Sequence, residues 1–379
     1  MSLALLIVVV ICALAVAYPM VLYPLLVQWL ARLRPRPWKS ADVDLSVAHL
    51  ITVFNEEKRI GAKLENAIAV RAPNGGLRTY VISDGSDDGT ERIVRSFADH
   101  DVHWIGCERQ GKERAQMTAI EQIDADILVF SDASSLLDEE SLRALVRPFA
   151  DPDVASVSGT DRLATDGKGT GEDIYVDYEM RVRRAESRVD SLVGLSGCYF
   201  AVRREVIDGW VPDVPNDMGS ALVSIIMGKR AVSVDDAHCT YGATTSSARE
   251  YKRKKRTALR GLRGLIAYRK ALTSGPRLAC WQIFSHKVMR FLAPFFSLVA
   301  LIAISVAALL GAAWAHWLGL LTLAGFGLAV AGLVVPALAR FKPIRALLFL
   351  VVSMAAVGAA WLAVFKSDSA ALWAPTERP

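Results

Sequence analysis

Cysteine is scarce and scattered in this sequence of 379 residues. The five cysteines are Cys12, Cys107, Cys198, Cys239 and Cys280, and no two of them form a CxxC pair. This spacing argues against a zinc site and against a disulfide framework, and it favours a reducing compartment for the globular part. The sequence also lacks internal repeats and low-complexity linkers. Small disulfide-rich domains and repeat proteins are therefore excluded.

Charge is absent from residues 2–30. A helix needs about 20 apolar residues to cross a hydrocarbon core of about 30 Å, so this run is long enough to span a membrane. It has no basic start and is too long for a signal peptide, which favours a retained anchor. Pro19 and Pro24 are expected to kink the anchor or to end its spanning part early.

Three further apolar runs are predicted to cross the membrane, at about 289–313, 317–339 and 345–365. The link 340–345 carries three basic residues, whereas the link Ala315-His316 has neither Lys nor Arg. A basic cluster, Arg32 to Lys39, also follows the anchor. The positive-inside rule places both basic segments in the cytoplasm. We therefore predict a multi-pass protein of a bacterial-type inner membrane, with four spans, outward-facing termini and a cytoplasmic globular part.

The globular part alternates between strand and helix patterns, which favours an α/β domain with a mainly parallel sheet. Strands are predicted over Leu45–Phe54, Thr79–Ser83, Val102–Gly106, Asp126–Ser131 and Val154–Ser158. Helices are predicted over Lys58–Val70, Thr90–His100, Lys112–Gln122, Glu139–Phe149, Glu172–Val189 and about Asn216–Met227. The expected organisation is an anchor (1–30), a globular domain (40–245), basic interfacial helices (246–287), three transmembrane helices (288–366) and a tail (367–379).

The acidic turn that follows the predicted strand Thr79–Ser83 is the first candidate for a site. Ligands of open α/β sheets bind outside the carboxyl ends of the strands, where Asp84 lies. A plain surface turn is the alternative, since Asp-Gly sequences are common in turns. An EF-hand calcium loop is excluded, because its twelfth position holds Arg95 instead of glutamate. Asp88 fits a helix N-terminus as well as a ligand contact.

Two more aspartates follow predicted strands or loops. Asp132 follows an apolar strand and suits a divalent cation that neutralises a nucleotide diphosphate, although it could also cap the next helix. Asp217 is the third acidic position. Gly111 and Lys112 open a helix whose free N–H groups, with the lysine, could meet phosphate charge; a loop with a surface lysine is the alternative.

A basic run, Glu250 to Thr257, lies close to the membrane part of the chain. Its cationic side chains, among them Arg253 and Arg256, could stabilise a leaving diphosphate. A solvated helix face, or one that rests on anionic lipid headgroups, is the alternative, and both uses are compatible.

Together these segments resemble glycosyltransferase family 2, the inverting GT-A-fold group that includes cellulose, chitin and hyaluronan synthases. The resemblance covers roughly residues 45–290. Its motifs occur in the family's order: Ile51 to Glu57, Asp84 to Thr90, Gly111 to Gln116, Ser131 to Ser134, Ser196 to Arg203, and Asn216-Asp217. The expected fold is an α/β GT-A domain with a mainly parallel sheet, plus transmembrane α-helices.

The resemblance implies a role for each matching position. The donor would contact Phe54, Glu56, Asp84, Gly111, Lys112, Asp132, Arg253 and Arg256. Asp132 would hold Mg²⁺ or Mn²⁺, and Ser196, Gly197 and Cys198 would bind the acceptor. Asp217 would be the catalytic base, because a sugar hydroxyl is a poor nucleophile at neutral pH and needs a carboxylate to take its proton.

The implied activity is transfer from a nucleotide sugar, chiefly a UDP-sugar, to a lipid-linked or growing glycan in polysaccharide biosynthesis. Ser134 replaces the second acid of the DxD motif and Asn216 replaces the glutamate of the ED motif. Thr257 stands where processive synthases carry the tryptophan of QxxRW, which argues against processive synthesis. Transfer to a polyprenyl phosphate and a non-catalytic scaffold are the alternatives. Membrane lipids, but no nucleic acid, are expected as partners, and an oligomer could supply further spans.

Overall fold

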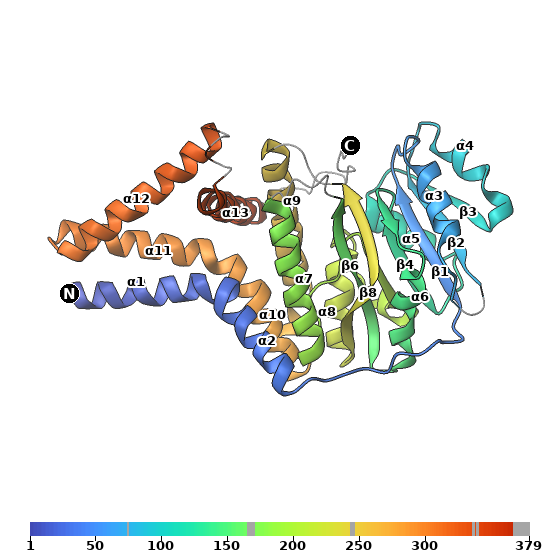
Figure 1. Cartoon of the computed structure of the whole chain (residues 1–379), viewed down its shortest axis with the longest axis horizontal. Coiled ribbons are helices and arrows are strands. Elements are labelled where there is room, and N and C mark those ends of the chain that lie inside the picture. The colour runs from blue at the N-terminus through green and yellow to red at the C-terminus, as the bar shows by residue number, and fades with distance from the viewer. Residues whose placement is uncertain (74–75, 165–170, 243–246, 336–337, 339–340, 367–379) are drawn as a thin grey trace. The chain divides into compact units, whose positions relative to one another are not determined.

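A computed structural model describes residues 1–73, 76–164, 171–242, 247–335, 338 and 341–366 of the chain. The chain forms two compact units (Figure 1). The membrane-helix unit comprises Met1–Leu26, Ser246–Leu262 and Phe284–Asp368. The sheet unit comprises Val27–Thr245 and Arg263–Ile283, together with the chain end Ser369–Pro379, which lies outside the described residues. The predicted tail, 367–379, lies outside them as well.

The sheet unit is built on one eight-stranded sheet with the order β3-β2-β1-β4-β7-β6-β8-β5. The strands are β1 (Val47–Val53), β2 (Arg78–Asp84), β3 (Val102–Cys107), β4 (Ile127–Asp132), β5 (Ser135–Leu137), β6 (Val154–Ala164), β7 (Tyr199–Arg203) and β8 (Arg230–Gly242). Strands β3, β2, β1 and β4 are parallel, as the sequence predicts. The second half is mixed, because β7 runs antiparallel to both β4 and β6.

The parallel strands carry apolar side chains on both faces because helices cover both sides of such a sheet. Every residue of β1 is buried. The register pairs Thr52 of β1 with Asp132 of β4, and Asp84 of β2 with Cys107 of β3. The carboxyl ends of these strands therefore meet along one edge of the sheet.

The helices of the sheet unit are α3 (Ile60–Ala69), α4 (Thr90–Arg95), α5 (Lys112–Ile120), α6 (Ser141–Val146), α7 (Gly171–Val189), α8 (Asn216–Ile226) and α10 (Arg277–Ile283). Each predicted helix of the sheet unit is present, and all of them except α7 are shorter than predicted, while α10 was not predicted separately. Two of the predicted helices end in a different geometry. The α4 segment continues as a 3₁₀ turn at Ala98–His100, and the α6 segment as one at Arg147–Ala150. Short 3₁₀ turns are frequent at the ends of α-helices.

Three strands are absent from the sequence-based prediction. They are β5, β7 and β8, and each of them pairs only with strands distant in the sequence. The register of β8 against β6 shifts between Ser158 and Thr160, where β8 advances from Ser233 to His238. Such a bulge interrupts the period-2 pattern by which a strand is recognised in a sequence.

The membrane-helix unit contains α1 (Ser2–Ala17), α11 (Met289–Leu309), α12 (Ala313–Val334) and α13 (Lys342–Phe365). The helix α9 (Ser247–Ala267) begins in this unit, and α2 (Tyr23–Leu33) leaves it. Within the described ranges, four helical segments are long and apolar enough to cross a membrane: Ser2–Leu33, Arg277–Leu309, Ala313–Val334 and Pro343–Phe365.

A π-helical turn, Tyr18–Leu22, lies at the first of the two prolines predicted to kink the anchor. A second π-helical turn, Phe284–Val288, precedes α11. The hydroxyls of Tyr18 and Ser285 lie 2.8 Å apart and join the two turns, and the rings of Tyr23 and His286 pack with centroids 5.9 Å apart. The widened turns thus meet each other inside the membrane-helix unit.

Candidate active site

Asp84 and Asp132 lie at the carboxyl ends of β2 and β4, with β1 between them. Phe54 follows β1 directly. These positions share one rim of the sheet because β2, β1 and β4 are parallel and in register. The side chain of Asp132 is partly exposed, whereas Asp84 is fully buried.

The carboxylate of Asp84 binds the turn that leads into α5. Its Oδ1 accepts hydrogen bonds from the backbone N–H groups of Gln110 and Gly111, each at 2.8 Å. Its Oδ2 accepts a hydrogen bond from the guanidinium of Arg109. A buried carboxylate with this many donors is well satisfied. In this structure Asp84 holds the 109–111 turn in place, and a direct contact with the donor stays a prediction.

Arg109 also covers the ring of Phe54, with its guanidinium carbon 3.4 Å from the ring centroid. Two glycines, Gly85 and Gly111, allow the backbone around Arg109 to pack closely here. Gly85 has a φ of +74°, and a Cβ there would lie 2.9 Å from the Cβ and N atoms of Arg109. Gly111 has a φ of +101°, a left-handed conformation that glycine adopts without strain, and it precedes the first residue of α5.

The acidic turn 85–90 is tied to the loop that follows β1. Asp88 accepts hydrogen bonds from the backbone N–H of Thr90 at 3.0 Å and from that of Glu57 at 3.1 Å. Burial opposes ionisation of Asp88, but a hydrogen bond from the Thr90 hydroxyl and these two backbone bonds lower its pKa. Glu57 in turn accepts a hydrogen bond from the N–H of Gly89 at 2.8 Å. Asp88 therefore stabilises the start of α4 and its neighbouring loop, which was one of its two predicted roles.

Lys112 lies in the first turn of α5 and reaches Asp132, with its Nζ 2.7 Å from Oδ1. Burial alone would lower the pKa of this lysine. The charge of Asp132 and its hydrogen bond, with smaller effects of Glu113 and Asp217, raise the pKa above its ordinary value instead. Lys112 is thus a permanent cation at the end of β4.

Four residues farther along α5, Gln116 connects two other parts of the rim. Its Nε2 donates to Oγ1 of Thr52 at 2.8 Å, and its Oε1 accepts from Nδ2 of Asn216 at 2.7 Å. All three side chains are buried. Lys112 and Gln116 lie on one face of the helix, so α5 links the ends of β1 and β4 to the start of α8.

Asp217 stands in the first turn of α8, next to Asn216. Its backbone carbonyl accepts a hydrogen bond from the N–H of Leu195 at 3.2 Å. A Cβ at Gly197 would lie 3.3 Å from its Oδ2, so the carboxylate rests against the Gly197 backbone. The predicted base therefore adjoins the predicted acceptor segment, within electrostatic range of Lys112.

The acceptor segment 196–198 is held by the side chain of Ser196, which is fully buried. Its hydroxyl bonds to Asp161 and accepts from the N–H groups of Cys198 and Tyr199, each at 3.1 Å. The carbonyl of Cys198 accepts a hydrogen bond from the N–H of Asp132 at 3.1 Å. Gly197 alone of the three is exposed, which leaves it to face a ligand.

Glu56 lies in the loop after β1 and is nearly fully buried. Burial raises the pKa of its carboxyl, the charge of Arg59 opposes this rise, and the charges of Asp132 and Asp88 add to it. Its carboxylate pairs with Arg59 at 3.3 Å. Glu56 thus lies within electrostatic range of Asp132. Its contact with the donor stays a prediction.

Arg253 and Arg256 lie on α9, in the part of that helix that belongs to the membrane-helix unit. Their predicted contact with the donor stays a prediction. The first residue of the predicted basic run, Glu250, has no described side chain.

A divalent cation fits the rim only if the substrate supplies most of its ligands. Among the described residues there is no cluster of three His, Cys, Asp or Glu side chains that could hold a metal ion. Asp132 is the one acid of its motif, and one of its oxygens contacts Lys112. Mg²⁺ is commonly held by one or two carboxylates together with substrate phosphates, so this donor set is sufficient.

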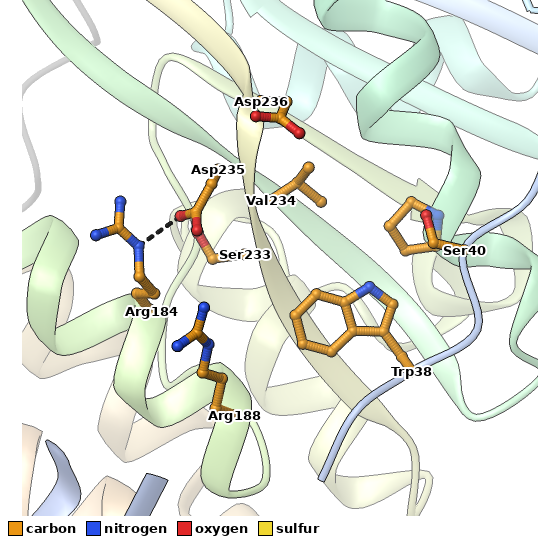
Figure 2. A pocket seen from close by; sticks show the side chains of 9 residues that line it. Trp38, Ser40, Arg184, Arg188, Ser233, Val234, Asp235 and Asp236 are labelled. Carbon is orange, nitrogen blue, oxygen red and sulfur yellow. Dashed lines mark hydrogen bonds and ion pairs between the residues drawn. The ribbon is translucent and has the colours of Figure 1, made fainter. Parts of the chain in front are cut away.

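A separate hollow of about 260 Å³ lies elsewhere in the sheet unit (Figure 2). It is lined by Trp38, Ser40, Pro148, Arg184, Arg188, Ser233, Val234, Asp235 and Asp236. An ion pair between Arg184 and Asp235, with an N–O distance of 2.5 Å, crosses its wall (Figure 2). None of the rim residues lines this hollow, so we do not assign the chemistry to it.

Sequence reasoning missed four residues that position the site. Thr52 and Gln116 were part of motif segments without a role of their own, and Arg109 and Asp161 had no assigned role. Thr52 and Asp161 both lie on strands, near the rim residues that they contact. A polar residue in an otherwise apolar buried strand was the available signal for Thr52.

Residues 49–210 match the family model described as glycosyl transferase family 2. The poly-beta-1,6-N-acetyl-D-glucosamine synthase of Staphylococcus aureus is 21% identical over 181 residues, which cover 46% of this chain and 43% of that protein. The glycosyltransferase AglE of Haloferax volcanii is 27% identical over 204 residues, or 52% of this chain and 61% of that protein. This chain therefore matches between about two fifths and three fifths of the length of these relatives.

A solved structure resembles the chain over nearly its whole length. The mannosyltransferase PcManGT from Pyrobaculum calidifontis, in complex with GDP-Man and Mn²⁺, superposes with a TM-score of 0.74 and 25% identity. The likeness covers 96% of this chain and 100% of that one. It therefore includes helices outside the segment matched by the family model.

Proposed function

Because this chain belongs to glycosyltransferase family 2 and has the GT-A fold, we propose that it transfers a sugar, with inversion, from a nucleotide-diphosphate donor to a hydroxyl of a lipid-linked or growing glycan. The observation that carries this proposal is the convergence of Lys112, Asp132 and Asp217 beside the exposed Gly197. A cation, a metal-binding carboxylate and a base are the groups that such a transfer needs.

Inversion requires attack by the acceptor oxygen from the side opposite the leaving diphosphate. Asp217 would accept the proton of the attacking hydroxyl, because its carboxylate adjoins the backbone of Gly197. Gly197 has no side chain and is exposed, so an acceptor can approach the carboxylate closely at this point. The buried hydroxyl of Ser196 holds the segment in place through its bonds to Asp161 and to two backbone N–H groups.

The leaving diphosphate gains negative charge in the transition state. Lys112 would stabilise this charge, since its ammonium is held at the rim by Asp132. A divalent cation, Mg²⁺ or Mn²⁺, bound by Asp132 and the donor would neutralise the diphosphate further. Asp84 supports this part of the site by fixing the turn from which α5 starts.

The donor is expected to be a UDP-sugar. The Pyrobaculum calidifontis neighbour was solved with GDP-Man, which makes GDP-mannose the second donor to test. The acceptor is expected at the cytoplasmic face of a bacterial-type plasma membrane, because a basic cluster, Arg32 to Lys39, follows the first apolar helix. A glycan acceptor is supported by the likeness to a polysaccharide synthase of Staphylococcus aureus.

Transfer to the phosphate of a polyprenyl lipid is the second candidate. It is supported by the cationic helix α9, which places Lys254 against a membrane-type helix. A phosphate oxygen is already ionised at neutral pH and needs no base. The two candidates therefore differ in their dependence on Asp217.

A panel of nucleotide sugars, read by thermal shift with and without Mg²⁺ or Mn²⁺, tests donor binding on the purified protein. A ligand at 100 times its dissociation constant stabilises the native state by about 2.7 kcal/mol. We expect one nucleotide class to raise the melting temperature, and product analysis then identifies the acceptor atom. If no nucleotide binds under any metal condition, the chain is a scaffold that retains the fold without the chemistry.

A further inference from the structure

Helix α13 has the composition of a membrane span, yet its contacts lie at one side of the membrane-helix unit. The most apolar 18-residue window of Pro343–Phe365 has a mean hydropathy of 2.4. We propose that α13 does not cross the bilayer but lies in the plane of the leaflet at the level where α11 starts, where it forms a lipid-contacting surface together with α9. This inference is independent of the enzymatic activity proposed above.

The crossing helices define two sides of the unit. The α11–α12 turn lies at one side with the start of α1, because Trp314 donates from Nε1 to Oγ of Ser2 at 3.0 Å. Trp314 and Leu318 also pack on a cluster formed by Val9, Ala303 and Ile304. The start of α11 and the end of α12 are therefore expected at the other side of the unit, together with the end of α1.

Both ends of α13 contact this second side. Near its start, Ile344 packs on Gly332, two residues before the end of α12, so closely that a Cβ at Gly332 would lie 2.8 Å away. Near its end, the indole Nε1 of Trp361 donates to the carbonyl of Phe291 at 2.8 Å. Phe291 is the third residue of α11.

A crossing α13 could not make these two contacts at once. Residues 344 and 361 are 17 positions apart, which corresponds to about 26 Å along a helix. In a span, Trp361 would face the far end of α11, near Leu309, instead of Phe291. Figure 1 shows α13 end-on while α1 and α11 are drawn lengthwise, so α13 is steeply inclined to both.

Helix α9 contacts the middle of α13 through a charged side chain. The Nζ of Lys254 lies 3.5 Å from the ring centroid of Phe349 and 3.4 Å from Oγ of Ser353. An ammonium near the centre of a bilayer is costly, whereas at headgroup depth it remains hydrated and close to lipid phosphate. The Gly261 backbone of the same helix packs on the ring of Phe291. Helices α9 and α13 and the start of α11 therefore share one level.

The partner that fits this surface is the acyl–headgroup boundary of a lipid leaflet. Large apolar side chains of α13 are exposed, among them Leu350, Leu362 and Phe365. Trp361 has the amphipathic indole that is enriched at membrane interfaces. Helices that lie in this boundary combine apolar side chains with basic ones, and here the basic ones are supplied by α9.

Spin-label depth measurements on the full chain in liposomes test the proposal. Leu347→Cys and Phe365→Cys place labels 18 residues, or five full turns, apart on the same face of α13. If α13 lies in the plane, oxygen and nickel-chelate accessibility will report similar depths for both labels. A difference near 27 Å, the length of 18 helical residues, would overturn the proposal.

Sidedness supplies a second test that does not need the depth scale. An impermeant maleimide is applied to sealed vesicles with Lys366→Cys, with Arg95→Cys on the sheet unit and with Leu310→Cys at the α11–α12 turn, each compared with the parent protein. All three positions are exposed. We expect Lys366→Cys to label from the same side as Arg95→Cys. Labelling from the side of Leu310→Cys would show a fourth crossing and reject the in-plane helix.

Discussion

The ammonium of Lys112 lies 2.7 Å from Oδ1 of Asp132, the carboxylate expected to bind the metal ion. In the protein without donor, the lysine therefore occupies one of the oxygens that a divalent cation would use. When the donor diphosphate binds, it offers Lys112 a second anion and supplies the cation with further oxygens. Metal and donor are thus expected to bind cooperatively.

Lys112→Met is expected to separate the two effects of this lysine. Without nucleotide, Mn²⁺ affinity measured by electron paramagnetic resonance should rise roughly tenfold, because a charge-assisted hydrogen bond of about 1.5–3 kcal/mol no longer competes for Asp132. With nucleotide present, donor affinity should fall, since a cation facing the diphosphate is lost. Lys229→Met is the matched control, because Lys229 pairs with Glu205 away from the rim. Unchanged Mn²⁺ affinity in Lys112→Met would refute the competition.

Asp217→Asn keeps the shape of the proposed base and removes its ability to take a proton. Turnover onto a hydroxyl acceptor should fall by roughly 10² to 10⁴, the usual contribution of general base catalysis. Donor binding by calorimetry should be retained. Full activity of this variant would remove Asp217 from the base role, and full activity onto a phosphate acceptor would favour the polyprenyl-phosphate alternative.

Gly197→Ala tests how closely the base is positioned. The new Cβ would lie 3.3 Å from Oδ2 of Asp217, so the carboxylate or the segment must move by a few tenths of an ångström. We expect turnover to fall roughly tenfold with little change in donor affinity, since small misplacements of reacting groups are costly. Gly61→Ala in α3 is the control, because its Cβ would make an ordinary contact with Ile93 at 3.9 Å. Equal activities of the two variants would contradict the assignment.

Asp84→Asn should destabilise the sheet unit more than it changes the chemistry. The substitution leaves Arg109 without its buried partner, which typically costs about 3–5 kcal/mol for a buried pair. Because Arg109 is partly exposed, we expect roughly 3 kcal/mol, read as a lower melting temperature. Asp138→Asn breaks the exposed pair with Arg162 and should change stability by less than about 1 kcal/mol. A loss of donor binding without a loss of stability would instead favour direct contact of Asp84 with the donor.

The buried imidazole of His49 is expected to make the folded protein less stable in acid. This side chain is buried in β1, with Nε2 2.7 Å from Oγ of Ser131. Burial, and secondarily the charge of Lys63, lower its pKa well below the ordinary 6.5. Below pH 6.5 the unfolded chain binds a proton that the folded chain does not, so stability falls by up to about 1.4 kcal/mol per pH unit. The melting temperature of the parent should therefore drop more than that of His49→Gln between pH 7.5 and 5. Parallel pH profiles would show that His49 does not titrate in this way.

The parallel half of the sheet could be predicted from the sequence because its signals are local. Strands β1 to β4 are short apolar runs, and the acidic residues that follow them fall at the predicted edge. Strands β7 and β8 could not be found in this way. Strand β7 follows a glycine- and serine-containing segment, and β8 contains a bulge with Asp235 and Asp236. Their pairing is set by distant strands, which single-sequence patterns do not encode.

The site shows the same division between local and distant signals. Lys112, Asp132 and Asp217 could be selected because each follows a recognisable strand or opens a helix. The partners that fix them could not be selected. Gln116 bonds to residues 64 and 100 positions away, and Ser196 bonds to Asp161 across 35 positions. For Asp84 the sequence indicated a ligand contact, which stays a prediction, but it did not indicate the hydrogen bonds that hold the neighbouring turn.

The bond between Tyr18 and Ser285 has a consequence for the order in which the protein is made. It joins residues 267 positions apart, so α1 leaves the ribosome long before its partner helix α11. At about 5–20 residues per second the delay is on the order of tens of seconds. During that time α1 is a solitary helix in the membrane, and the whole sheet unit can fold while tethered to it. The contacts around Tyr18 can form only afterwards, and they close the chain into a loop whose two ends meet at one place in the membrane-helix unit.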